Sequence, residues 1–114
     1  MNLLFPETAV VLPAPFDHQL FEGFDYKLVQ AFIEWHQANP DVYREFESMA
    51  KTMHRKGRAR YSQWTLVNAL RWKRDLHTTG DEFKINNNWI ALLARLFVVR
   101  NPSMSSFFEL RTKK

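Results

Sequence analysis

The chain has no cysteine and only three glycines among its 114 residues. Without cysteine, disulfides, thiolate metal sites and cysteine catalysis are excluded, and a reducing cytoplasm is the expected location. The isolated glycines cannot build a phosphate-binding loop, and their scarcity argues against a fold of tight hairpins. No uncharged apolar run approaches the ~18 residues that span a membrane. We therefore expect a cytoplasmic protein with no membrane contact.

Basic side chains are nearly missing from the first fifty residues. That part carries two basic and eight acidic side chains, a net charge of −6, whereas residues 51–114 carry fourteen basic and four acidic ones, a net charge of +10. Such asymmetry indicates a polyanion-facing surface on the C-terminal half, most simply for nucleic acid. It concerns partners rather than fold or reaction.

Apolar material is plentiful enough for one core, because 46% of the residues are hydrophobic and 15% are aromatic. Periodicity predicts a mainly α fold, a compact single domain of four or five helices over residues 25–114. The apolar segment 89–100 should be its central helix. Residues 9–12 and 82–85 are candidates for a minor β element.

Capping residues predict where the helices begin and end. Asp25 should start the first helix, and Asn39 and Pro40 should end it and begin the second. Gly57 should end the second helix, and Ser62 should cap a third that reaches about residue 75.

Residues 1–24 are predicted to form an extended N-terminal arm, because Pro13 and Pro15 oppose helix. Four phenylalanines in this segment favour packing as a strap across the helices. A free arm that binds a partner is the alternative.

The connector between the second and third helices is the strongest local signal for a binding site. It carries four cations within six residues, Arg55, Lys56, Arg58 and Arg60. On a nucleic acid they would contact phosphates, which gives salt-dependent affinity without sequence reading. A solvated loop that serves only solubility is the alternative. The nucleic-acid interpretation requires these cations to converge on one face with those of the third helix.

The second and third helices also invite comparison with a helix-turn-helix, in a winged form if residues 82–85 make a strand. The third helix would then enter the DNA groove, and base edges would be read by Gln63, Asn68, Arg71 and Arg74. The connector is longer than the usual turn of three or four residues, which weakens the comparison.

Two interpretations of Trp72 are open. It lies between Arg71 and Lys73, with Tyr61 and Trp64 nearby, and this basic and aromatic platform would stack the bases of a single strand. Alternatively, the third helix packs on two sides and Trp72 is buried, as aromatic residues at helical spacing commonly are.

Catalytic and metal-binding patterns are weak. Asp75 followed by Glu82 and Lys84 resembles the metal-binding set of some Mg²⁺-dependent nucleases, but the spacing is short and the strands of such a core are missing. The four histidines are too far apart in sequence to suggest a shared metal. We therefore expect no enzyme activity, no metal and no cofactor.

Arg95 interrupts the most apolar helix and should have a structural role. An unpaired buried guanidinium is costly, so a carboxylate partner is expected. Glu45, Glu47 and Glu109 are the candidates. A role of Arg95 in binding is the alternative.

Several short motifs lie between residues 25 and 111. They are NPDVY at 39–43, ALRW at 69–72, FKINNNW at 83–89, ARLF at 94–97, NP at 101–102 and FFELR at 107–111. Together they resemble a group of small, mostly uncharacterised proteins encoded by bacteriophages and prophages. The resemblance implies a phage setting inside a bacterial host and carries over no catalytic residue.

The sequence as a whole predicts a non-catalytic nucleic-acid-binding accessory or regulatory protein of phage type, with DNA favoured over RNA. The expected binding residues lie on the connector and the third helix: Arg55, Lys56, Arg58, Arg60, Gln63, Asn68, Arg71, Trp72, Lys73 and Arg74. The alternative is a phage effector or adaptor that binds a host or rival-phage protein without catalysis.

Overall fold

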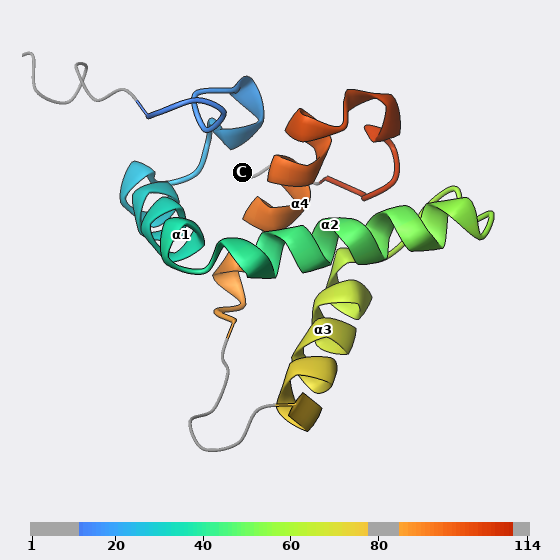
Figure 1. Ribbon diagram of the computed structural model, residues 1–114. Helices are drawn as coiled ribbons and strands as arrows, with labels where there is room; N and C mark the ends of the chain where they lie inside the picture. The colour runs from blue at the N-terminus through green and yellow to red at the C-terminus, as the bar shows by residue number, and fades with distance from the viewer. Residues whose placement is uncertain (1–11, 78–84, 111–114) are drawn as a thin grey trace, which may run out of the picture.

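The computed structural model describes residues 12–77 and 85–110. The predicted mainly helical fold is confirmed: the described residues form four α-helices and two short 3-10 helices, and no strand (Figure 1). The candidate β element falls almost wholly outside the described residues. In chain order the elements are η1 (Gln19–Phe21), α1 (Tyr26–Ala38), α2 (Pro40–Arg55), α3 (Gln63–His77), α4 (Asn88–Arg100) and η2 (Pro102–Met104).

The predicted capping residues fix both sides of the connector, which we count from Arg55, the last residue of α2, to Ser62. Gly57 ends α2 with a φ of +99°, a left-handed conformation that glycine adopts without strain. Before α3, the Thr65 N–H donates a hydrogen bond to Ser62 Oγ at 3.1 Å. Asp25 caps α1 in the same way, accepting from the Lys27 N–H at 3.0 Å.

Asn39 joins α1 to α2 in a different way from its predicted capping role. Its side-chain amide donates to the Trp35 carbonyl at 2.9 Å, so it closes α1, and it makes no side-chain hydrogen bond to α2. Pro40 takes the first position of α2, where no N–H is needed and the ring already holds a helical φ. The two helices therefore meet at a corner (Figure 1).

The central position predicted for α4 is confirmed. Nine of its thirteen residues are buried, and it packs against α1, α3, η1 and η2. α2 adds aromatic contacts to the same core, with the Phe46 ring 6.5 Å from Phe97 and 5.4 Å from Phe108. Burial of this apolar surface is the main favourable contribution to folding.

Residues 12–24 pack as a strap across the helices. Phe16 and Phe21 are buried with 4% and 3% of their surface exposed, and the Phe16 ring meets Phe32 edge-on at 6.0 Å. Of the two interpretations of the N-terminal arm, this part of the chain supports the strap. Residues 1–11 lie outside the described residues.

The segment after α4 folds back onto the connector. Phe107 and Phe108 are buried against Phe97, with ring centroids 6.1 and 5.2 Å from it. The Tyr61 N–H donates to the Phe107 carbonyl at 2.9 Å, and the two rings stack 6.4 Å apart. The end of the connector nearest α3 is therefore held in place.

Candidate nucleic-acid interface

The four cations of the connector are all exposed to solvent: Arg55, Lys56, Arg58 and Arg60. They lie at the far end of α2, where the chain turns toward α3 (Figure 1). Arg55 donates to Thr52 Oγ1 at 3.2 Å, and within the described part of the chain none of the four forms an ion pair. No carboxylate of residues 12–77 and 85–110 therefore compensates the positive charge of the connector.

Two of the α3 cations are neutralised by carboxylates of α2. Arg74 contacts Asp41 at 3.0 Å and Glu45 at 2.9 Å, and Lys73 contacts Glu45 at 2.7 Å. Burial alone would raise the pKa of Glu45, but the hydrogen bonds and charges of Lys73 and Arg74 outweigh it and lower this pKa. These two cations hold α3 against α2 and leave little charge for a polyanion.

The two groups of cations do not merge into one strip. Glu45 lies near the start of α2, whereas Arg55 is its last residue. At ~1.5 Å per residue, about 15 Å of helix separates them. The expectation that the connector and α3 share one basic face is therefore not met.

Three of the four side chains expected to read base edges bind other parts of the protein, and the fourth, Asn68, accepts from Arg71 within α3. Arg71 donates to Asn68 Oδ1 at 2.8 Å and to Asn87 Oδ1 at 2.6 Å, and so ties α3 to the start of α4. Gln63 Nε2 donates to the Glu109 carbonyl at 3.0 Å. Arg74 is paired with Asp41 and Glu45 of α2. Groove reading would require these contacts to break.

The remaining residues of the predicted wing and nuclease patterns give no further support. Glu82 and Lys84 lie outside the described residues, and Asp75 is exposed on α3. Nowhere in residues 12–77 and 85–110 do three His, Cys, Asp or Glu side chains gather closely enough to hold a metal ion. The described helices are also too short or too polar for any of them to cross a membrane.

Two tryptophans of α3 are exposed, Trp64 by 50% and Trp72 by 67%. The interpretation in which Trp72 is buried is therefore wrong. α3 buries a single face, formed by Leu66, Val67 and Leu70, and Trp72 projects from the other side of the helix.

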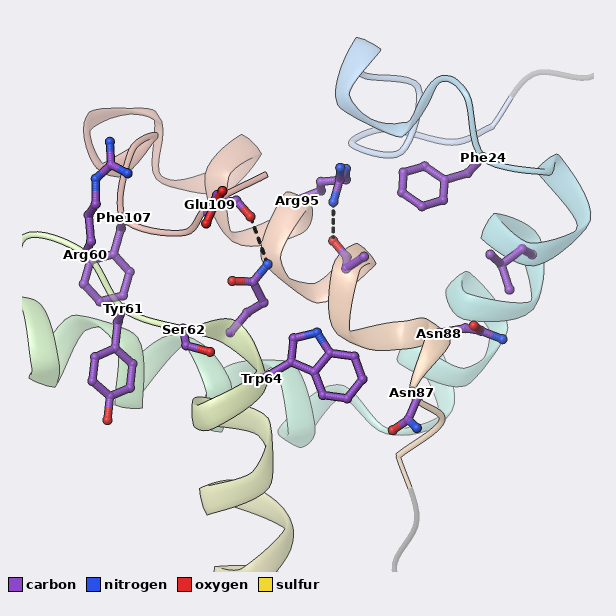
Figure 2. Close-up of a pocket in the computed structure, with 13 residues that line it drawn as sticks. Phe24, Arg60, Tyr61, Ser62, Trp64, Asn87, Asn88, Arg95, Phe107 and Glu109 are labelled. Atoms are coloured by element: carbon purple, nitrogen blue, oxygen red, sulfur yellow. Dashed lines mark hydrogen bonds between the residues drawn. The ribbon is translucent and has the colours of Figure 1, made fainter. Parts of the chain in front are cut away.

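Trp64 also lines a cavity of about 800 Å³ that sequence analysis did not foresee (Figure 2). Its walls come from four separate parts of the chain, namely the strap with α1, the connector with the start of α3, α4, and the C-terminal segment. The lining residues are Phe24, Leu28, Arg60, Tyr61, Ser62, Gln63, Trp64, Asn87, Asn88, Ala91, Arg95, Phe107 and Glu109.

Arg95 contributes a buried guanidinium to this cavity. Only 6% of the residue is exposed, and burial lowers its pKa. Its Nη1 donates to the Ala91 carbonyl at 3.1 Å, and its guanidinium carbon lies 4.8 Å from the centre of the Phe24 ring.

Two of the three carboxylates considered as partners of Arg95 serve other groups. Glu45 holds the α3 cations, and Glu47 accepts from Tyr43 and Asn101, each at 2.9 Å. The third, Glu109, lines the same cavity as Arg95. The sequence did contain one indication of this site, because Arg95 is a charged residue within the otherwise apolar residues 89–99 of α4.

Comparison with known proteins adds no family to these observations. The chain matches no protein-family model, no curated protein and no solved structure. The resemblance to phage-encoded proteins therefore stays a prediction.

Proposed function

We propose that the protein binds single-stranded nucleic acid without catalysis through a smaller surface than the sequence predicted, the connector cations Arg55, Lys56, Arg58 and Arg60 together with Trp64. The predicted surface shared by the connector and α3 is given up, because Lys73 and Arg74 are paired with carboxylates of α2. One observation supports the proposal most directly. Four exposed cations that form no ion pair among the described residues are followed closely in the chain by Trp64, four residues after Arg60. Trp64 is half-exposed and lines a cavity. DNA in a phage-infected or prophage-carrying cell is the favoured partner.

The physical basis is the combination of charge and stacking surface. Lysine and arginine contact phosphates whatever the base sequence, and their binding releases counterions from the strand. A tryptophan face stacks on any base, because every base has a π-face. Proteins that bind single strands without sequence preference combine these two features.

A single strand fits this surface better than a duplex. A duplex reader would use the side chains of α3, yet Arg71 and Arg74 are engaged by α4 and α2. The stacking surface of Trp64 is of use only when bases are unpaired and reachable. The connector charges would hold either form, so the preference for a single strand should come from Trp64.

Fluorescence anisotropy with labelled oligonucleotides of about 12 nucleotides, within the usual site size of one module, tests the proposal. A single strand should bind more tightly than a duplex of the same sequence. Its affinity should fall roughly 50-fold between 50 and 200 mM salt if four phosphates are contacted. Failure to bind any oligonucleotide at 50 mM salt, or tighter binding of the duplex, would remove the proposal.

A pair of charge-matched variants locates the surface. Lys56→Gln with Arg58→Gln removes two connector charges, and Lys27→Gln with Arg44→Gln removes two exposed charges from α1 and α2. The first variant should bind a single strand roughly tenfold or more weakly at 50 mM salt, since two phosphate contacts are lost. The second should bind within about twofold of the wild type.

Binding of a protein partner, as expected of a phage effector or adaptor, is the second candidate. Trp72 favours it, because this residue is 67% exposed and does not line the cavity. Exposed tryptophans are common anchors of protein interfaces. Co-purification with a host or phage protein that Trp72→Ala abolishes and Trp64→Ala retains would support it, and equal capture by both variants would count against it.

A further inference from the structure

We propose that the cavity beside the connector binds one nucleotide unit, with its base against Trp64 and its phosphate toward Arg95. This inference rests on the proposed function and deepens it, because it assigns a place to an unpaired nucleotide of the bound strand. The same chemistry is offered by a free mononucleotide, and the experiments below distinguish the two sources.

The size and walls of the cavity suit such a ligand. About 800 Å³ lies within the range of ~300–1,000 Å³ typical of small-molecule sites. Aromatic side chains from three parts of the chain line it: Phe24, Tyr61, Trp64 and Phe107. A nucleobase is planar and needs a flat apolar surface, so aromatic walls match it better than they match a sugar or an inorganic ion.

The polar groups lie where a nucleotide could use them. Figure 2 shows the Trp64 ring and the Asn88 amide in one half of the cavity and Arg95 with Phe24 in the other. A base stacked on Trp64 would therefore lie near an amide that can donate and accept hydrogen bonds. Its phosphate would extend toward the arginine side.

The charge of the cavity favours an anion. Among the described residues that line it, two are arginines, Arg60 and Arg95, and one is a carboxylate, Glu109. Arg95 is held by packing within the buried α4, so its position does not depend on the ligand. A guanidinium carries five N–H donors directed along several edges, and it can bind a phosphate through two of them at once.

Arg60 connects the cavity to the rest of the proposed interface. It is the last of the four connector cations and also a lining residue of the cavity. A strand whose backbone follows the connector is thereby led to the cavity mouth. The nucleotide that enters is most simply a terminal one, because an end needs no second path out of the cavity.

Isothermal titration calorimetry with adenosine monophosphate, adenosine and inorganic phosphate tests the cavity alone. The monophosphate should bind at least tenfold more tightly than either of the others, because only it engages both Trp64 and Arg95. Trp64→Ala should weaken it about tenfold or more. Trp72→Ala is the matched control, an exposed tryptophan of the same helix outside the cavity, and should leave the affinity within about twofold.

A second variant tests the phosphate contact. Arg95→Gln should make the monophosphate and adenosine bind equally, and Arg95→Lys should restore part of the difference. Thermal unfolding shows whether each variant is folded. If Arg95→Gln does not fold, the comparison of Trp64→Ala with Trp72→Ala still decides, because both side chains are exposed and their loss should not unfold the protein.

Competition between adenosine monophosphate and oligonucleotides shows whether the cavity takes a nucleotide of the bound strand or a free mononucleotide. If a linear single strand displaces the monophosphate and a circular strand of the same composition does not, a terminal nucleotide occupies the cavity. If the monophosphate binds and strands bind without displacing it, the cavity takes a free nucleotide, so its assignment to the bound strand fails and the proposed function stands. If the monophosphate binds but no strand binds at 50 mM salt, the proposed function fails. If strands bind in a salt-dependent way but the monophosphate does not bind, or if both tryptophan variants weaken it equally, the cavity proposal fails and the proposed function stands.

Discussion

Glu45 shows how a single carboxylate can fix the position of a helix. It accepts from Lys73 at 2.7 Å and from Arg74 at 2.9 Å, and only 22% of its side chain is exposed. A charge that receives two such donors is stabilised in the folded state more than in the unfolded chain. The pKa of Glu45 is accordingly lowered from its ordinary value of 4.5.

We predict that Glu45→Gln lowers the unfolding free energy by about 1 kcal/mol at pH 7. The folded pKa lies below the unfolded one, so this contribution is complete above pH 4.5 and is lost as the pH falls through the folded pKa. Urea unfolding at pH 7 and pH 3 measures both effects, and the difference between variant and wild type should shrink at pH 3. Glu34→Gln, an exposed carboxylate of α1 without an ion pair among the described residues, should change little.

His36 is a half-buried residue that packs its ring against aromatic side chains of the core, at the cost of an unsatisfied ring nitrogen. Its ring stacks on Phe32 at 6.1 Å and meets Tyr43 edge-on at 5.7 Å, and its buried Nδ1 has no hydrogen-bond partner among the residues that the structure describes. Burial, and then the charge of Arg100, lower its pKa from 6.5. Neutral histidine is therefore the form that packs.

The consequence is a loss of stability below pH 6.5, because the unfolded chain takes up the proton first. We predict that His36→Phe keeps the stacking and removes this loss between pH 7 and pH 5. At pH 7 it should leave stability equal or raise it by up to about 1 kcal/mol, since the unsatisfied nitrogen is gone. Thermal unfolding across this pH range measures it. His54→Phe, which replaces an exposed histidine of α2, is the control. If the stability of both variants depends on pH to the same extent, the interpretation is contradicted.

At the scale of elements, the end of α2 determines where the connector points. Gly57 has a φ of +99°, and a Cβ placed there would meet no atom within 4 Å. Any penalty for a side chain is therefore backbone strain rather than a clash.

We predict that Gly57→Ala lowers the unfolding free energy by roughly 1 kcal/mol, and Gly57→Asn by less, because asparagine tolerates the left-handed region better. Chemical denaturation of the two variants provides the comparison. The affinity of the folded Gly57→Asn variant for a single strand should stay within about twofold, because all four cations remain. Equal stability of Gly57→Ala and wild type would show that the turn relaxes without cost.

Helix positions were predictable because their signals are local. Asp25, Pro40, Gly57 and Ser62 each act within one turn of the chain, and the structure places the helix ends beside them. The pairing of Arg74 with Asp41 was not predictable, because it depends on how α3 crosses α2. The angle at which two helices cross is set by how their side chains pack together, and these side chains are far apart in the sequence.

At the scale of the whole molecule, the parts of the candidate site that are contiguous in sequence could be predicted, and those assembled from distant segments could not. The connector is contiguous in sequence, and its exposed cations could be foreseen as one group. The cavity is assembled from segments as distant as Phe24 and Glu109, so only the folded chain brings them together. The net charge of the C-terminal half overstated the interface, because Lys73 and Arg74 are compensated by carboxylates of the acidic half.

The salt dependence of single-strand affinity tests the central claim most directly, compared among wild type, Lys56→Gln/Arg58→Gln and Lys27→Gln/Arg44→Gln. Both variants lose two charges, so only the location of the loss differs. At ~0.7 per phosphate contact of a single strand, the connector variant should reduce the slope of log affinity against log salt by about 1.4. The other variant should keep the wild-type slope. Equal slopes for the two variants would show that the connector is not where the strand binds.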